Sequence, residues 1–188
     1  NVLEAEIPLI LANAKHVRAL PGEKSDNKDG KRVASYLRHG LIRASFVPPR
    51  DIRELRDLTR YRKKLLANGA AERNRIQKIL EDANIKLGSV LSDVFGVSGQ
   101  RMLHALVEKP SVNVEEVTAL AHWRLQPKIE ELKKALEGRI TAHHRFMIEL
   151  SLDHMEYIEK QILRLDEQID RHLAPYQKQV ELLQTIPG

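Results

Sequence analysis

The architecture of this chain follows from residues 129–173, which read IEELKKALEGRITAHHRFMIELSLDHMEYIEKQILRLDEQIDRHL. Apolar residues recur there, mostly in steps of three and four over about six heptads, at Leu132, Leu136, Ile140, Met147, Leu150, Ile158, Ile162, Leu165, Ile169 and Leu173. This spacing predicts one long helix, opened by Pro127, that packs in a coiled coil or in an antiparallel hairpin.

A second long helix is predicted from Pro49 to Asn84, although Gly69 lowers its stability by about 1 kcal/mol relative to alanine. Its apolar positions are Ile52, Leu55, Leu58, Leu65, Ile76, Ile79 and Leu80. This helix can pair with the long helix of the same chain, or the long helix can pair with its counterpart in another copy. The sequence leaves both pairings open. Shorter helices are expected around residues 89–95, 100–107 and 114–123.

The first residues have a different character. Residues 8–14 read PLILANA, a short apolar run that predicts a buried strand. Residues 31–39 predict a helix that ends at Gly40, and residues 41–47 predict a second extended piece. The expected fold is therefore mostly α, with a small α/β remnant at its start.

Composition narrows the class of protein. The 188 residues carry 31 Lys and Arg against 26 Asp and Glu, a net charge of +5, which is compatible with a polyanionic partner. With no cysteine, disulfides and cysteine-based zinc sites are excluded. No run approaches the roughly 20 apolar residues of a membrane span, and no signal peptide is evident, so a soluble cytoplasmic protein without a membrane partner is expected.

The positive charge is concentrated in residues 50–64, RDIRELRDLTRYRKK. This segment contains Arg50, Arg53, Arg56, Arg60, Arg62, Lys63 and Lys64. It can be a solvated helix face with Glu54 and Asp57 as local partners, or a helix that contacts phosphates, and we favour the second interpretation. Because aromatic residues make up only 4% of the chain, an extended base-stacking platform is poorly supported.

A candidate site for chemistry lies in residues 21–30, PGEKSDNKDG. Asp26 and Asp29 are three residues apart at the start of a helical pattern, so their carboxylates can share one face and hold Mg²⁺. They can equally cap the helix, since acids suit its positive end. Lys24 and Lys28 flank the pair and can contact nucleic-acid phosphate.

Other sequence patterns are weaker candidates for a catalytic or metal-binding site than the two aspartates. His143 and His144 are adjacent, so they point about 100° apart on a helix and suit a core or interface better than one metal ion. His154 falls at a position of the predicted seam, where a polar group can help to set register. No Ser, His and Asp set, glycine-rich phosphate loop or CxxC pattern is evident.

Several consecutive blocks resemble the DEDD-type insertion-sequence transposases of bacteria, over essentially the whole chain. They are NAKHVRALPGEKSDNKDGKRVASYLRHGLIRASFVPP, IRELRDLTRYR, NRIQKILEDANIKLGSVLSDVFGVSGQRML, ALEGRITAHHRF and LLQTIPG. The resemblance implies a nuclease domain of the RNase-H or RuvC-like type, in a recombinase guided by a bridge RNA.

Residues 24–29 match the Lys-Thr/Ser-Asp-x-x-Asp motif of that family, so the resemblance makes Asp26 and Asp29 the third and fourth acids of a Mg²⁺-binding catalytic tetrad. The motifs of the first Asp and of the Glu are absent from the chain, as is the C-terminal domain that supplies a nucleophilic serine. Gly30 departs from the alanine common in the family, which should cost some local stability.

The resemblance also implies a domain division. Residues 1–48 would be the C-terminal part of the nuclease domain, residues 49–185 a helical coiled-coil region that supports homo-oligomers, and residues 186–188 the start of the C-terminal domain. DNA and a guide RNA would be the partners, in the bacterial cytoplasm at the nucleoid. The fragment alone is expected to be inactive. Two alternatives remain, namely a structural coiled-coil protein and a non-catalytic module that binds RNA or DNA.

Overall fold

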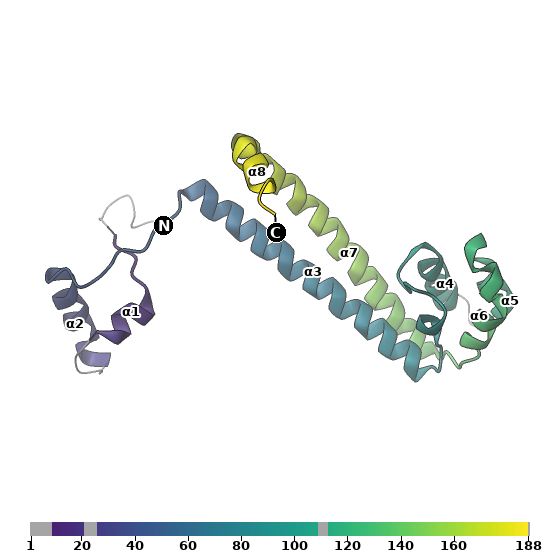
Figure 1. The fold of residues 1–188 in the computed structure, drawn as a ribbon. Coiled ribbons are helices and arrows are strands. Elements are labelled where there is room, and N and C mark those ends of the chain that lie inside the picture. The colour runs from purple at the N-terminus through teal and green to yellow at the C-terminus, as the bar shows by residue number, and fades with distance from the viewer. Residues whose placement is uncertain (1–8, 21–25, 109–112, 188) are drawn as a thin grey trace. The chain divides into compact units, whose positions relative to one another are not determined.

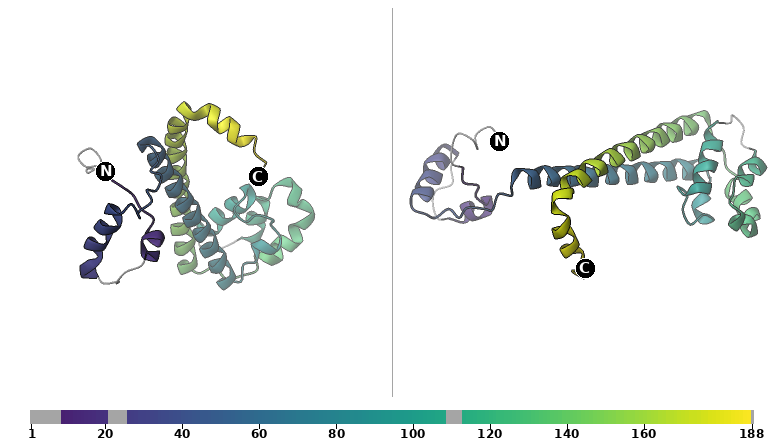
Figure 2. Two further views of the ribbon diagram at one scale, coloured as in Figure 1. Left: turned by 60° about the vertical axis from the view of Figure 1, so that its left-hand side comes forward. Right: turned by 90° about the horizontal axis from the view of Figure 1, so that it is seen from above.

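Two long helices, α3 (Arg50–Asp82) and α7 (Ala142–Leu173), lie side by side and run in opposite directions (Figures 1 and 2). The computed structural model describes residues 9–20, 26–108 and 113–187. The chain divides into two units, residues 1–53 and 54–188, and most of α3 belongs to the second. The predicted helix from Pro49 to Asn84 is thus confirmed, with Gly69 in its continuous interior.

The two helices meet along a seam in which buried and half-buried residues recur in steps of three and four. On α3 these residues are Leu58, Arg62, Leu65, Gly69, Glu72, Ile76 and Ile79. On α7 they are Ile148, Ser151, Met155, Ile158, Ile162, Leu165 and Ile169. Such spacing keeps one face of each helix turned toward its neighbour along the whole contact.

Three polar contacts across the seam fix the antiparallel register. Asp82 pairs with His144, Glu72 with His154, and Arg62 with Asp166. The α3 partners therefore descend in steps of ten residues while the α7 partners ascend in steps of ten and twelve, as antiparallel helices require. The sequence had left open whether α3 or a second copy covers α7, and within this chain α3 does so.

Asn84 ends α3 with a left-handed backbone conformation, at a φ of 56°. The N–H of Ile85 donates to the carbonyl of Leu80 at 2.7 Å, and the N–H of Asn84 donates to that of Glu81 at 2.9 Å. This is the Schellman pattern of helix termination. The N–H of Arg139 donates to the carbonyl of Ala83 at 2.8 Å, which ties the approach to α7 to the end of α3.

Residues 85–108 and 113–140, which connect α3 to α7 in the chain, form a helical head at one end of the hairpin (Figure 1). It contains η2 (Leu87–Ser89), α4 (Val97–Glu108), α5 (Val114–Ala119), η3 (Trp123–Lys128) and α6 (Ile129–Ala135). Its core joins the hairpin through fully buried side chains, which include Ile76, Leu87, Met102, Leu103, Leu106, Leu132, Leu136 and Ile148. The head is therefore packed onto the hairpin end.

The prediction of one long helix opened by Pro127 is wrong. Pro127 lies inside η3, α6 ends at Ala135, and α7 begins only at Ala142. The break coincides with a tertiary contact at Gly138, where an added Cβ would lie 2.4 Å from the carbonyl oxygen of Ala83, so the backbone passes the end of α3 closely. Thr141 then starts α7 by accepting a hydrogen bond from the N–H of His144 at 3.2 Å.

Of the shorter predicted helices, the one around residues 100–107 is confirmed as α4, and the one from Val114 begins there as α5 but ends earlier than predicted. Around residues 89–95 the chain forms only the short 3₁₀ helix η2, the next helix begins at Val97, and α5 ends at Ala119. After α7, the chain continues through η4 (Ala174–Tyr176) into α8 (Gln177–Gln184). None of the helices described is both long and apolar enough to cross a membrane.

The buried strand predicted for residues 8–14 is not formed by the described residues. Leu9, Ile10 and Leu11 are more than half exposed, and only an isolated antiparallel bridge joins Ala12 to Ala44. Asn13 instead begins helix α1 (Ala14–Ala19), because its side chain accepts a hydrogen bond from the N–H of Lys15, in the first turn, at 2.9 Å. The α/β remnant is thus reduced, in the described part of unit 1, to two extended segments with that one bridge.

The helix predicted before Gly40 is present as α2 (Asp26–Arg38). Gly40 has a φ of 69°, and the N–H of Leu41 donates to the carbonyl of Tyr36 at 2.9 Å. The predicted glycine cap is therefore confirmed. Glycine suits this position because it adopts positive φ without steric cost.

Replacing Gly69 with alanine should stabilise the protein. The nearest atom to the added methyl would be Cγ2 of Ile158, at 3.8 Å, which is an ordinary contact, and alanine favours the helix by about 0.8–1 kcal/mol. We expect a higher free energy of unfolding in urea denaturation followed by circular dichroism.

Gly138→Ala is the matched control, because its methyl would collide with the carbonyl of Ala83. That variant should be less stable than the parent. A loss of stability in Gly69→Ala would contradict the seam geometry.

Candidate functional site

Asp26 and Asp29 lie in the first turn of α2, with Asp26 as its first residue. The predicted spacing of three on a helix start is therefore present. The side chains of Asp26 and Lys28 and the whole of Lys24 lie outside the described residues, so only Asp29 is placed in detail. Its half-exposed carboxylate forms an ion pair with Arg32, one turn along the helix.

The donor chemistry of the pair suits Mg²⁺, which prefers carboxylate oxygens in octahedral geometry. Across the described residues, no group of three or more His, Cys, Asp or Glu side chains is placed to hold a metal ion. Two carboxylates leave most positions of an octahedral ion unfilled. The pair can therefore contribute to a site and does not complete one.

A basic face runs along the first half of α3. Arg56, Arg60, Lys63 and Lys64 are all exposed. With about 100° between successive helix residues, they project from the side of α3 opposite Leu58, Leu65 and the rest of the seam. Arg50 is exposed and Arg53 is half-buried, and both make contacts within the structure.

Arg62, from the same basic segment, faces the seam and pairs with Asp166 of α7. Its Nη2 donates to Oδ2 of Asp166 at 3.2 Å, in a two-pronged contact with Nε. The hydrogen bond to Asp166 raises the pKa of Arg62, and the hydrogen bond from Arg62 lowers the pKa of Asp166. This cation stabilises the hairpin and does not extend the basic face.

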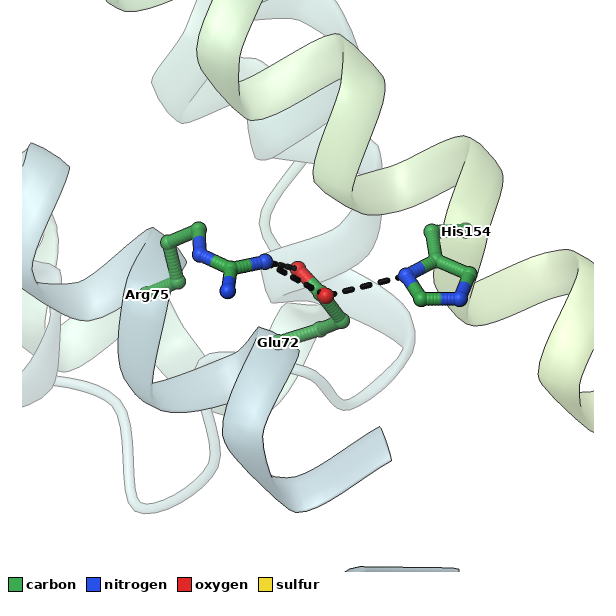
Figure 3. A network of polar contacts seen from close by, with 3 residues as sticks. All are labelled: Glu72, Arg75 and His154. Atoms are coloured by element: carbon green, nitrogen blue, oxygen red, sulfur yellow. Dashed lines mark hydrogen bonds and ion pairs between the residues drawn. The ribbon is translucent and has the colours of Figure 1, made fainter. Parts of the chain in front are cut away.

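The most buried carboxylate of the seam is Glu72, whose side chain is 6% exposed. Figure 3 shows Arg75 of α3 and His154 of α7 converging on it. Nδ1 of His154 lies 2.9 Å from the carboxylate, and because a carboxylate only accepts, this ring nitrogen carries the proton. Burial favours a raised pKa, but hydrogen bonds from Arg75, His154 and Ser151 outweigh it, so the pKa of Glu72 is below its ordinary value.

Sequence reasoning missed Glu72, although a signal was available. It falls between Leu65 and Ile76 at the three-and-four spacing of the seam, where an acid must find a partner on the opposite helix. The predicted interface position of His154 is where the structure places it. The network consists of paired groups across a helix contact and stabilises the hairpin.

The adjacent histidines have separate environments. His143 is exposed, whereas Nδ1 of His144 accepts from the N–H of Thr141 at 3.3 Å. The proton of His144 is therefore on Nε2, which lies 2.9 Å from Asp82. This ring caps α7 and connects it to the end of α3, so an interface role fits the contacts better than a metal site.

Comparison with known proteins adds one finding. Residues 2–85 match the family model of the IS110-type DEDD transposases, which is described as "Transposase". The match covers the segment with Asp26 and Asp29 and extends through α3. Over that segment the chain is similar to this transposase family. No curated protein and no solved structure matches the chain.

The Glu72 network should make stability depend on pH in the acid range. Because the pKa of Glu72 is lower in the folded chain than its ordinary value of 4.5, the unfolded chain binds its proton first as pH falls. The stabilisation is complete above pH 4.5 and is lost as pH falls through the folded pKa. Glu72→Gln should flatten this part of the curve and reduce stability at pH 7 by about 1–3 kcal/mol.

Urea denaturation between pH 3 and pH 7 measures both effects. Glu81→Gln removes an exposed carboxylate from the same helix and serves as the control, with an unchanged pH profile. Equal profiles for Glu72→Gln and the parent chain would contradict the proposed network.

Proposed function

We propose that this chain is part of an IS110-type transposase that cuts and rejoins DNA at the end of an insertion sequence. The observation that carries the proposal is the Lys-Ser-Asp-x-x-Asp motif at the start of α2, inside the segment that matches the transposase family. Under this proposal, residues 1–48 belong to a RuvC-like nuclease domain. The protein would act at the nucleoid of a bacterial cell.

Asp26 and Asp29 would contribute two carboxylates to a Mg²⁺ site. When bound, the metal would activate the attacking oxygen and stabilise the leaving oxygen. Arg32 holds the Asp29 carboxylate, and this contact would orient it or would have to yield when the ion binds. The 188 residues contain no matching motif for the family's other two acids or its serine, so this chain alone would leave DNA uncut.

The basic face of α3 would contact the sugar-phosphate backbone of DNA or of a guide RNA. Four exposed cations, Arg56, Arg60, Lys63 and Lys64, share this face, and the seam residues that anchor α3 lie opposite them. Phosphate contacts of this kind position a nucleic acid without reading its sequence. The hairpin would act as the coiled-coil region through which copies of the protein assemble.

A second candidate is a structural helical protein in which the two acids only stabilise a helix start. The ion pair between Asp29 and Arg32, three residues apart on α2, favours it. The two candidates differ in how Mg²⁺ should affect α2.

Mg²⁺ should perturb the start of α2 through both acids. In ¹H–¹⁵N spectra of the chain, titration with MgCl₂ should shift the amides of residues 26–30, and Asp26→Ala with Asp29→Ala should abolish the shifts. Asp57→Ala removes an exposed acid from α3 and should leave them intact. If the double variant has a lower melting temperature but its amide signals still shift on addition of MgCl₂, the two acids only stabilise the start of the helix.

Neutralising the basic face should weaken binding to nucleic acid and its dependence on salt. In the combined variant Arg56→Gln, Arg60→Gln and Lys63→Gln, the plot of log association constant against log salt concentration for duplex DNA should become less steep. Its negative slope should shrink in magnitude by about 2–3, at roughly 0.9 per lost phosphate contact. Fluorescence anisotropy of a labelled duplex at several salt concentrations measures this slope.

The control carries the same change of charge on exposed residues of α7 and α8, with Arg164→Gln, Arg171→Gln and Lys178→Gln. It should keep a slope close to that of the parent chain. Equal losses in the two triple variants would show that net charge, and not the face of α3, governs binding.

A further inference from the structure

Trp123 is the only tryptophan of the chain, and it lies outside the core with 69% of its surface exposed. It is the first residue of η3, in the helical head. Tryptophan usually buries most of its large ring, so an exposed one is an unusual use of the residue. The ring is available to a partner of the protein.

The backbone that carries this ring is held firmly on both sides. The N–H of His122 donates to Oγ of Ser98 in α4 at 3.0 Å, and the N–H of Leu125 donates to the carbonyl of His122 at 2.8 Å. The side chain of Leu125 packs against the buried core. The indole is therefore presented on a fixed support, which reduces the entropy lost when a ligand binds.

One cation and one imidazole ring lie beside the indole, and the imidazole of His122 is neutral because its Nδ1 accepts from the N–H of Arg124. The guanidinium carbon of Arg124 lies over one face of the ring, 5.3 Å from its centroid, and the centroid of the His122 ring lies 5.4 Å away at an interplanar angle of 40°. Arg124 and Lys128 are the charged residues of η3, both are exposed, and neither forms an ion pair with any residue that the structure describes. We call His122, Trp123, Arg124 and Lys128 the Trp123 patch.

We propose that the Trp123 patch binds one unpaired base of a single-stranded nucleic acid, which stacks on the indole while Arg124 and Lys128 contact the adjoining phosphates. Bases in a duplex are stacked on their neighbours, so only an unpaired base offers its face to the ring. The low aromatic content of the chain limits the site to a single base. An apolar protein partner would find the Arg124 guanidinium over the ring and the exposed Lys128 in the same short helix, and a nucleic acid is complementary to both charges.

The patch is separate from the basic face of α3. It lies on η3, within the helical head, whereas that face lies in the first half of α3. The face suits the backbone of any nucleic acid, whereas the patch requires an unpaired base. The two proposals can therefore fail independently.

Intrinsic fluorescence tests the patch directly, because Trp123 is the only source of tryptophan emission. Titration of the chain with an oligothymidine and an oligouridine of about 12 nucleotides should quench this emission. A duplex of the same length should cause much less quenching. The two single strands separate a preference for DNA from one for RNA, and quenching by either supports the proposal.

Anisotropy of the labelled oligonucleotides measures affinity in the variants. Trp123→Leu should weaken single-strand binding about tenfold and leave duplex binding unchanged, and Trp123→Phe should recover part of the loss. Tyr157→Leu removes an aromatic ring that is 58% exposed on α7 and should change neither affinity. Circular dichroism checks that each variant is folded.

Three outcomes would overturn the proposal. These are absence of oligonucleotide binding, binding without a change in tryptophan emission, and equal loss of single-strand and duplex affinity in Trp123→Leu. The variant in which Arg56, Arg60 and Lys63 are replaced by Gln should still show quenching of tryptophan emission by single strands. Failure of the α3 interface has a different signature, because the salt dependence of duplex binding would then be the same in this variant as in the parent chain.

Discussion

The contact between α3 and α7 is the constraint on which the second unit depends. Each helix places a residue at the seam every three or four positions, and Glu72 occupies one of these positions near the middle of the contact. A buried carboxylate is costly unless it is paired, and Arg75 and His154 pair with it. A shift of one helical turn between α3 and α7 would separate Glu72 from His154 and leave the carboxylate buried without this partner. Burial of Glu72 therefore costs desolvation energy but favours the observed register over registers shifted by one turn.

This arrangement separates two kinds of charge on one helix. Arg62 turns into the seam and is neutralised by Asp166, while Arg56 and Arg60 turn outward and remain exposed. The sequence shows only a run of cations, and the direction of each side chain depends on where the seam lies. Burial of the apolar side of α3 is therefore what gathers its free positive charge on one surface.

Much of the fold follows from local signals in the sequence. Helix α3 and the end of α2 at Gly40 were predicted correctly, because apolar periodicity and glycine at positive φ act over a few residues. The division of the second long segment into α6 and α7 could not be predicted, because it depends on the approach of Gly138 to Ala83, far away in the sequence. The strand expected at residues 8–14 failed for a related reason, since a strand needs neighbours and the described residues provide only the bridge to Ala44.

The candidate site was predicted in part. The spacing of Asp26 and Asp29 placed both acids at a helix start, and the structure has them there. The exposure of Trp123 could not be predicted from an aromatic residue in a short polar segment, because burial depends on how η3 packs on α4 and the core.

The hydrogen bond from Arg139 to Ala83 also has a consequence for the order of folding. It closes the hairpin at the end that carries the head, so the ends of α3 and α7 are already close once the head has formed. Each further pair of seam residues, one on α3 and one on α7, then closes only a small additional loop. Most of the entropy cost of loop closure therefore arises at the first contact. The hairpin should therefore zip from the head toward Arg62 and Asp166, with the layers near the head forming in the folding nucleus and those at the far end last.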